Sequence, residues 1–282
     1  MNNMYINFDP VAISLGPFFI YWYGILYAVG FIYSLKTAKI RRKNLCFYWE
    51  TKEMEKFFYI GFICILIGGR IGYIIFYKPT FFIANPIWIF KIWTGGMSFH
   101  GGFIGILIFI SIYSKKMNIK FFYISDFIAP LIPLGIGLGR LGNFINGELW
   151  GKVTLNTKFF CFFPKSIYDD IKIIEKNNSL IPIFEKYGSL PRHPSQLYEM
   201  FLEGFLLFII LNVFVKKHVR HGVISGIFLI FYGLLRIISE LFRQEDSQIG
   251  LIFDKISMGQ LLSFPMIFFG LTLLVFTKKK IF

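Results

Sequence analysis

Three charged side chains stand out because they lie inside long apolar stretches. Arg140 and Arg236 each occur near one end of such a stretch, and Glu240 follows Arg236 by four residues. Tyr232, Arg236 and Glu240 are spaced i, i+4, i+8, so a helix would present a phenol, a guanidinium and a carboxylate on one face. Guanidinium groups offer paired donors to phosphate oxygens, which favours an anionic ligand. The alternative is an ion pair between Arg236 and Glu240 that locks two helices together.

A glycine-rich stretch, residues 139–151 (GRLGNFINGELWG), holds the densest set of polar groups. Arg140, Asn143 and Asn146 recur there at i, i+3, i+6, which places guanidinium and amide groups on one side of a helix. Four glycines in the same stretch argue against a regular helix and for close backbone approach. The pattern suits an anionic oxygen ligand, although a polar, capped helix end would also produce it.

Two further residues could take part in chemistry. His100 lies among glycines at the expected lipid–water boundary, where a titrating imidazole is unusual. Arg70 lies within the run 68–72 (GGRIG), whose small residues permit close helix contact, so a pairing role is as plausible as substrate contact. No histidine and carboxylate have metal-ligand spacing, and we therefore predict neither a metal nor a cofactor.

His193 is expected to be structural, whereas His218 and His221 belong to a basic loop and are expected to be solvated. His193 precedes Pro194 at the start of an apolar run, and Ser195 is expected to cap the helix that follows. Cysteines occur only at positions 46, 64 and 161, without a CxxC motif, which argues against a disulfide framework or a thiolate zinc site.

The composition determines the class of protein. The chain of 282 residues is 55% hydrophobic and only 16% charged, whereas soluble domains are about 25% charged. Its mean hydropathy is +0.60, which indicates a multi-span membrane protein. The net charge of +14 comes mainly from short basic clusters between apolar runs, and no basic face with interleaved aromatics indicates nucleic-acid binding. The first basic residue is Lys36, so the N-terminus does not resemble a cleavable signal.

Seven apolar runs are long enough to cross a bilayer, and they predict an all-α, multi-pass integral membrane protein. They cover residues 17–35, 57–77, 97–114, 121–144, 196–215, 222–242 and 256–276. The run 80–93 is shorter and contains a proline and a lysine, so we expect an interfacial arm.

The basic residues predict the orientation of the spans. One set of connecting segments holds sixteen lysines and arginines, and the short loops of the other set hold four. The positive-inside rule places the first set in the cytoplasm, with the N-terminus outside and the C-terminus in the cytoplasm. Residues 152–193 then form a small external head between the fourth and fifth spans.

The polar residues of separate spans are expected to share one depth. With a rise of 1.5 Å per residue, Tyr23 and Arg236 lie about 9 Å, and Arg70 roughly 10 Å, below the outer ends of their spans. Ionisable residues inside a membrane mark function by default. A small transporter would carry them near the midplane between repeats, and no such repeat occurs here. A transporter or a lipid-binding module remains the alternative to an enzyme.

Residues 139–151 resemble the signature of bacterial prolipoprotein diacylglyceryl transferases. Similar segments run from the N-terminus to the last span, and residues 152–188 are least alike. The matching segments are residues 21–24, 68–73, 95–102, 126–133, 192–199, 232–243 and 257–260. The resemblance implies seven spans in the bacterial inner membrane and a site open to its outer face.

The resemblance also implies the reaction. The donor would be phosphatidylglycerol, and the acceptor would be the lipobox cysteine thiol of a preprolipoprotein with its signal peptide. The products would be a diacylglyceryl thioether and glycerol phosphate, in the first step of lipoprotein maturation. Substrates and surrounding membrane lipids would be the partners.

Ten residues match functional positions of the family. They are Tyr23, Arg70, His100, Arg140, Asn143, Glu148, Gly151, Tyr232, Arg236 and Glu240, to which the signature stretch adds Asn146. Arg140 and Arg236 would hold the phosphate and stabilise the leaving group, with a neutral hydrogen bond from Asn143. His100 would be the base for the thiol or a ligand of the phosphate.

The other matching residues would shape the site. Glu240 would orient Arg236, and Glu148 would orient the signature loop. The phenols of Tyr23 and Tyr232 would line the cavity for the lipid. The reactive thiol belongs to the substrate, so no enzyme cysteine is required.

Overall fold

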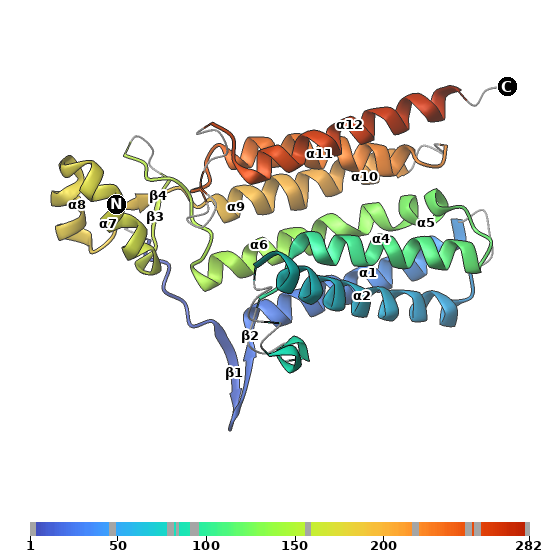
Figure 1. The fold of residues 1–282 in the computed structure, drawn as a ribbon, viewed down its shortest axis with the longest axis horizontal. Helices are drawn as coiled ribbons and strands as arrows, with labels where there is room; N and C mark the ends of the chain where they lie inside the picture. The colour runs from blue at the N-terminus through green and yellow to red at the C-terminus, as the bar shows by residue number, and fades with distance from the viewer. Residues whose placement is uncertain are drawn as a thin grey trace. The chain divides into compact units, whose positions relative to one another are not determined.

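A computed structural model describes residues 4–44, 49–77, 82, 85–90, 96–155, 159–215, 220–245, 250 and 255–279. Within these ranges, only the backbone is described at positions 44, 76, 77, 88, 99, 100, 278 and 279. Figure 1 shows the ribbon of the chain with its helices and strands labelled. The chain forms two compact units, of which the first comprises Met1–Ser34 and Ile128–Phe282, and the second comprises Leu35–Phe127.

Long helices dominate both units, as the hydropathy predicts. The principal helices are α1 (Trp22–Arg41), α2 (Thr51–Tyr77), α4 (Phe99–Lys116), α5 (Phe121–Ile128), α6 (Ile132–Asn146), α9 (Ser195–Glu199), α10 (Leu207–Val215), α11 (Val223–Glu240) and α12 (Met258–Lys279). Between α9 and α10 lies a π-helical segment, η7 (Met200–Leu206).

Five helical segments of the described chain are long and apolar enough to cross a membrane. They are Thr51–Ile75, Phe121–Asn146, Ser195–Val215, Val223–Glu240 and Met258–Thr277. The chain is therefore a mostly helical, multi-pass membrane protein. The two other predicted spans, residues 17–35 and 97–114, fall largely on α1 and α4.

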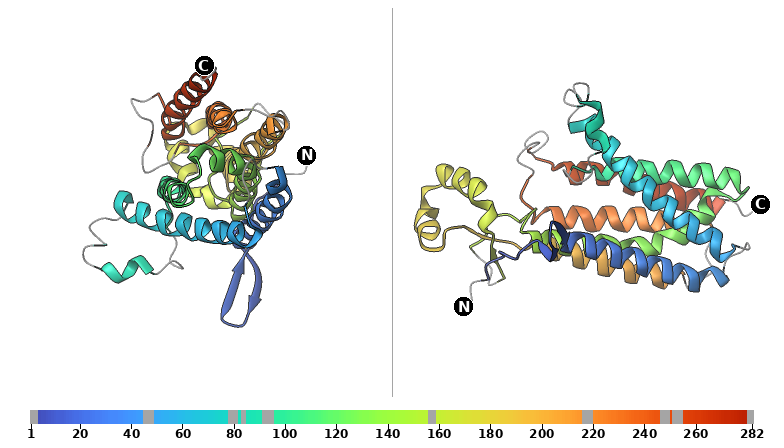
Figure 2. Two further views of the ribbon diagram at one scale, coloured as in Figure 1. Left: turned by 90° about the vertical axis from the view of Figure 1, so that its right-hand side faces the viewer. Right: turned by 90° about the horizontal axis from the view of Figure 1, so that it is seen from below.

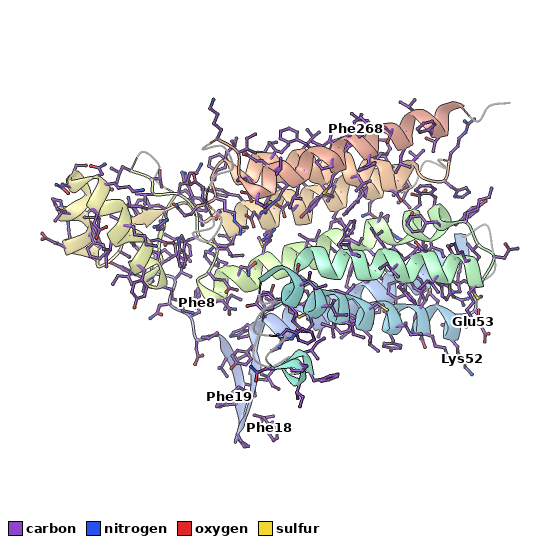
Figure 3. All side chains as sticks on the ribbon, in the orientation of Figure 1. Phe8, Phe18, Phe19, Lys52, Glu53 and Phe268 are labelled. Carbon is purple, nitrogen blue, oxygen red and sulfur yellow. The ribbon has the colours of Figure 1, made fainter. Side chains whose placement is uncertain are left out.

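The N-terminal region departs from the all-α prediction. Strands β1 (Val11–Leu15) and β2 (Phe18–Tyr21) form an antiparallel hairpin that turns at Gly16, and α1 begins only at Trp22. The periodicity of a short apolar run does not distinguish a strand from a buried helix. Hydropathy alone therefore predicted that the first span begins earlier in the chain than α1 does. Phe18 and Phe19 project from the hairpin (Figure 3).

The predicted fourth span, residues 121–144, is confirmed as the apolar segment Phe121–Asn146, but it is not one continuous α-helix. A 3-10 turn, η4 (Ala129–Leu131), separates α5 from α6, because prolines at 130 and 133 cannot donate the helical hydrogen bond. The glycines predict irregular backbone from residue 139, but α6 continues as a regular helix to Asn146. The helix ends at Gly147, which has a left-handed conformation. Packing explains the difference, since a Cβ at Gly142 would lie 2.5 Å from the Tyr23 ring.

Glycine contacts draw the helices of the first unit together. A Cβ at Gly204 in η7 would lie only 2.6 Å from the Cα of Gly137 in α6, so these backbones touch. Helix α11 packs along α12 and beside α10 (Figures 1 and 2). A buried cluster fills the space between them, formed by Ala129, Leu207, Leu211, Ile224, Ile227, Phe228, Tyr232 and Leu235.

The second unit is built on the contact between α2 and α4. A Cβ at Gly68 would lie 2.4 Å from the carbonyl oxygen of Gly101, so the small residues around Arg70 do permit close helix contact. Of the predicted interfacial arm, residues 80–93, the structure describes a 3-10 helix, η2 (Pro86–Phe90), and isolated positions. The remaining arm residues lie outside the described ranges.

The segment 152–193 forms a small subdomain with its own secondary structure. It contains η5 (Pro164–Ser166), α7 (Ile167–Lys176), η6 (Asn178–Leu180), α8 (Ile181–Tyr187), and the paired strands β3 (Cys161–Phe162) and β4 (Pro191–Arg192). Asp170 anchors the subdomain, because its buried carboxylate accepts a 2.9 Å hydrogen bond from Arg192 Nε. The second sheet is another departure from an all-α fold.

Candidate active site

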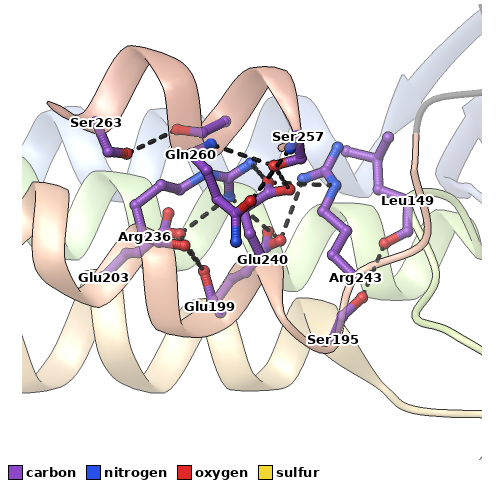
Figure 4. Close-up of polar contacts among 12 residues, drawn as sticks. Leu149, Ser195, Glu199, Glu203, Arg236, Glu240, Arg243, Ser257, Gln260 and Ser263 are labelled. Carbon is purple, nitrogen blue, oxygen red and sulfur yellow. Dashed lines mark hydrogen bonds and ion pairs between the residues drawn. The ribbon is translucent and has the colours of Figure 1, made fainter. Parts of the chain in front are cut away.

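Buried charges converge where three helical elements of the first unit meet (Figure 4). Helix α6 supplies Arg140. Helix α11 supplies Arg236 and Glu240, which Figure 4 labels. The fifth predicted span supplies Glu199 from α9 and Glu203 from η7. Both glutamates are fully buried, so each must be paired within the protein.

Two carboxylates bridge the two arginines. Arg140 places Nε 2.9 Å from Glu199 Oε2 and Nη2 3.2 Å from Glu203 Oε2. Arg236 places Nη1 3.2 Å from Glu199 Oε1 and 3.0 Å from Glu203 Oε1. Ser239 Oγ also donates to Glu203 Oε1 at 3.0 Å. The arginines are therefore held at one place although they come from different helices.

Glu240 pairs with Arg236, as the i, i+4 spacing predicts. Its Oε1 accepts from Arg236 Nη2, and its Oε2 accepts from Ser257 Oγ at 2.8 Å. Gly259 lies against this carboxylate, since a Cβ there would be 2.5 Å from Oε1. Arg243 adds a third guanidinium, with Nη1 3.1 Å from Glu199 Oε1. The ion pair between Arg236 and Glu240 exists, but it is part of a larger cluster.

The cluster contains three guanidiniums and three carboxylates, so its formal charges cancel. Its members are Arg140, Arg236, Arg243, Glu199, Glu203 and Glu240. Removing one partner of a buried pair typically costs about 3–5 kcal/mol, because the other charge is left buried and unpaired. Among the described residues, no three histidine, cysteine or acidic side chains are placed to hold a metal.

Glu199 and Glu203 lie inside the fifth predicted span, residues 196–215, and are not among the site residues predicted from the sequence. The available signal was their spacing of four, which places two acids on one helix face inside an apolar run. Arg243 was likewise not assigned. Their connection to Arg140 became visible only from the packing of the helices.

The signature loop folds back onto the end of α6. Glu148 Oε1 accepts from Asn143 Nδ2 at 2.9 Å and lies 3.4 Å from Asn146 Nδ2. Gln196 Nε2 donates to the carbonyl oxygen of Glu148 at 2.7 Å. The predicted role of Glu148 in ordering this loop agrees with these contacts.

Ser195 is expected to cap α9, but it does not. It is the first residue of the helix, and Pro194 occupies the preceding position without a side-chain cap. The Ser195 hydroxyl instead donates to the carbonyl oxygen of Leu149 at 3.1 Å. Leu149 has a φ of +57°, so the hydroxyl supports a strained position of the loop.

Gly151 ends the signature at a crowded backbone junction. Its N–H donates to the His193 carbonyl oxygen at 3.0 Å, and its own carbonyl accepts from Arg192 Nη1 at 3.0 Å. A Cβ here would lie 2.4 Å from the His193 oxygen and 2.7 Å from that of Phe242. Burial lowers the pKa of His193, whose Nδ1 lies 3.1 Å from the Tyr198 hydroxyl. These contacts favour the predicted structural role of His193.

The two predicted phenols lie on different helices of the first unit. The Tyr23 ring packs against Gly142 of α6, and its hydroxyl lies 3.2 Å from that of Tyr27. Tyr232 is buried one turn before Arg236 and stacks on Phe228, with ring centroids 5.7 Å apart. Tyr23 therefore neighbours the signature helix, and Tyr232 shares a helix with Arg236.

Arg70 and His100 belong to the second unit. Arg70 is buried, and it donates from Nε to the Ile89 carbonyl at 3.1 Å and from Nη1 to the Gly96 carbonyl at 3.2 Å. These bonds favour the pairing alternative for Arg70. The His100 backbone lies in the first turn of α4, where Ser98 caps the helix, but its side chain is outside the described part of the chain.

The fold and the site together define a multi-pass membrane protein with a buried guanidinium–carboxylate cluster beside a polar loop. The family of prolipoprotein diacylglyceryl transferases matches residues 10–276. The chain belongs to this family, which confirms the resemblance seen in residues 139–151.

Similar proteins extend over the whole chain. The phosphatidylglycerol–prolipoprotein diacylglyceryl transferase of Proteus mirabilis (strain HI4320) is 50% identical over 99% of this chain and 96% of its own length. The protein of that name from Wigglesworthia glossinidia brevipalpis is 54% identical over 99% of this chain and its full length. That from Serratia proteamaculans (strain 568) is 48% identical over 99% of this chain and 98% of its own.

Proposed function

We propose that the chain transfers the diacylglyceryl group of phosphatidylglycerol to the cysteine thiol of a prolipoprotein. Family membership and the printed names of its relatives support this activity. The observation that carries the proposal is the juxtaposition of Arg140 and Arg236 on shared carboxylates. Two fixed guanidiniums from different helices suit a single phosphate better than they suit a purely structural lock.

The reaction exchanges one bond for another. The thiol sulfur forms a bond to the terminal glyceryl carbon of the diacylglyceryl group, and the bond from that carbon to the phosphate oxygen breaks. Glycerol phosphate leaves with the bonding electron pair, so negative charge grows on the phosphate. Arg140 and Arg236 stabilise that charge with preorganised donors.

The carboxylates supply the preorganisation. Glu199 holds Arg140 Nε, and Glu240 holds Arg236 Nη2, so neither guanidinium has to be ordered when the lipid binds. Asn143 donates one amide hydrogen to Glu148 and has a second for a phosphate oxygen. Tyr23, Tyr232 and Asn146 line the site that the lipid enters. Gly151 fixes the end of the signature loop.

The thiol must lose its proton before or during attack. His100 is the proposed base, since an imidazole titrates near the required range, and a direct bond to the phosphate is its alternative role. Cys161 is unsuited as an enzyme nucleophile, because burial raises the pKa of its thiol to about 11. The nucleophile therefore comes from the prolipoprotein.

The proposed arrangement in the membrane has seven spans in the bacterial inner membrane. Helices α1 and α4 join the five segments of sufficient length and hydropathy. The N-terminus and residues 152–193 lie outside, the C-terminus lies in the cytoplasm, and residues 80–93 lie along the interface. The distribution of basic residues supports this orientation.

The activity is tested with purified full-length protein, phosphatidylglycerol and a peptide that carries a lipobox cysteine. We expect a thioether-linked diacylglyceryl peptide and one glycerol phosphate for each peptide modified. Phosphatidylglycerol that binds or crosses the membrane without either product would support a transporter or a lipid-binding module instead.

A further inference from the structure

Glu203 holds a position that the other carboxylates of the cluster do not share. Its Oε2 lies 3.2 Å from Arg140 Nη2, and its Oε1 lies 3.0 Å from Arg236 Nη1. It therefore contacts a terminal guanidinium nitrogen of both arginines proposed to hold the phosphate. A phosphate that bridges these two arginines would compete with Glu203 for their terminal nitrogens.

The other two carboxylates act as anchors. Glu199 forms an ion pair with Arg140 at Nε rather than at a terminal nitrogen, and its Oε2 accepts no hydrogen bond from the described residues. Its Oε1 faces Arg236 and accepts from Arg243 Nη1. Glu240 is fixed at its second oxygen by Ser257 and crowded by Gly259. Each arginine thus retains an anchoring carboxylate if Glu203 withdraws.

The surroundings of Glu203 permit such a withdrawal. Ser239 Oγ donates to the same oxygen that faces Arg236, so the carboxylate keeps a partner when it leaves the arginines. Glu203 also lies in η7, a π-helical segment, and π-helical turns occur frequently at functional sites.

We propose that Glu203 is an exchangeable counter-ion, which the phosphate of the lipid displaces from Arg140 and Arg236 and which returns as glycerol phosphate leaves. This inference rests on the proposed function. Without Glu203, the cluster would carry one net positive charge and would retain the doubly charged product. Glu203 is thus a positioning residue that favours product release.

Glu203→Gln tests the proposal in the full-length protein, with glycerol phosphate as the probe in titration calorimetry. Removing the competing negative charge should tighten glycerol phosphate binding by about tenfold or more. The variant should also show a lower kcat and a lower KM for phosphatidylglycerol, because product release becomes limiting. A purely structural role would weaken binding and would not lower KM.

Glu199→Gln is the matched control, because it removes an equally buried carboxylate and the same charge from the neighbouring turn. It should fail to tighten glycerol phosphate binding, since an anchor is lost rather than a competitor. Equal tightening in both variants would overturn the assignment to Glu203. Unchanged or weaker binding in Glu203→Gln would overturn it as well.

Glu203→Asp provides a second test if the Glu203→Gln variant does not fold. The shorter carboxylate cannot reach both arginines, so glycerol phosphate should bind more tightly than to the unmodified protein, by a smaller factor than with glutamine. Unchanged binding would contradict the inference. If the unmodified protein neither binds glycerol phosphate nor transfers lipid, the proposed function fails. If it does both and the variants bind no more tightly, only this inference fails.

Discussion

Arg140 and Arg236 show why a residue type can matter beyond its charge. Arg140 contacts two carboxylates through Nε and Nη2, and Arg236 contacts three through Nη1 and Nη2. A lysine ammonium cannot reproduce this planar arrangement of donors. We expect Arg140→Lys and Arg236→Lys to lose about 10²–10³ in transfer rate, at every pH. Rates measured at matched expression and matched Tm would test this. Near-normal activity in either variant would show that charge alone suffices.

His100 should respond differently to pH if it is the base. His100→Gln is expected to lose about 10²–10⁴ in rate near neutral pH, because the thiol then has no proton acceptor. Raising the pH toward the thiol pKa of about 8.5 should restore part of the loss, since thiolate forms without assistance. A pH–rate profile beside that of Arg140→Lys tests this. Equal impairment from neutral to alkaline pH would assign His100 to phosphate binding or to structure.

The enzyme's own thiols should be dispensable. The raised pKa of Cys161, about 11, keeps its thiol protonated at pH 7–8, so it should react slowly with alkylating reagents in the folded protein. Replacing Cys46, Cys64 and Cys161 together with serine or alanine should preserve transfer activity, provided that the variant inserts normally. Inactivity of a correctly folded variant would indicate a covalent enzyme intermediate.

At the scale of elements, Gly151 joins the signature loop to the segments around His193 and Phe242. Gly151→Ala would force the backbone apart, because its Cβ would lie 2.4 Å from a carbonyl oxygen. We expect a loss of about 1–3 kcal/mol in stability, together with most of the transfer activity. Gly135→Ala in α6 is the control, since its Cβ would meet nothing within 4 Å. Thermal melts and transfer rates of both variants test the difference, and similar behaviour would contradict it.

Hydropathy located the helices better than it located their ends. It predicted α11 and α12 almost in full, because a long apolar run has few alternatives in a membrane. It missed the hairpin before α1, the 3-10 turn at η4 and the π-helical segment η7. These features depend on proline positions and on neighbouring helices, which an average over a window does not register.

At the scale of the whole molecule, the orientation in the membrane remains a prediction. Reporter fusions at Asn118 and Lys279 should give cytoplasmic signals, because basic clusters surround both positions. A fusion at Asn178, within the subdomain of residues 152–193, should give an external signal. A cytoplasmic signal from Asn178 would contradict the seven-span arrangement.

The sequence by itself determined the membrane class, the family and the candidate residues Arg140, Arg236 and Glu240. Composition, hydropathy and the signature at residues 139–151 are local properties, so they can be recognised without the fold. Only the tertiary structure showed that Glu199 and Glu203 hold both arginines. The physical reason is that close glycine contacts between α6 and η7 determine which side chains meet. These contacts bring together residues more than sixty positions apart in the sequence, such as Arg140 and Glu203.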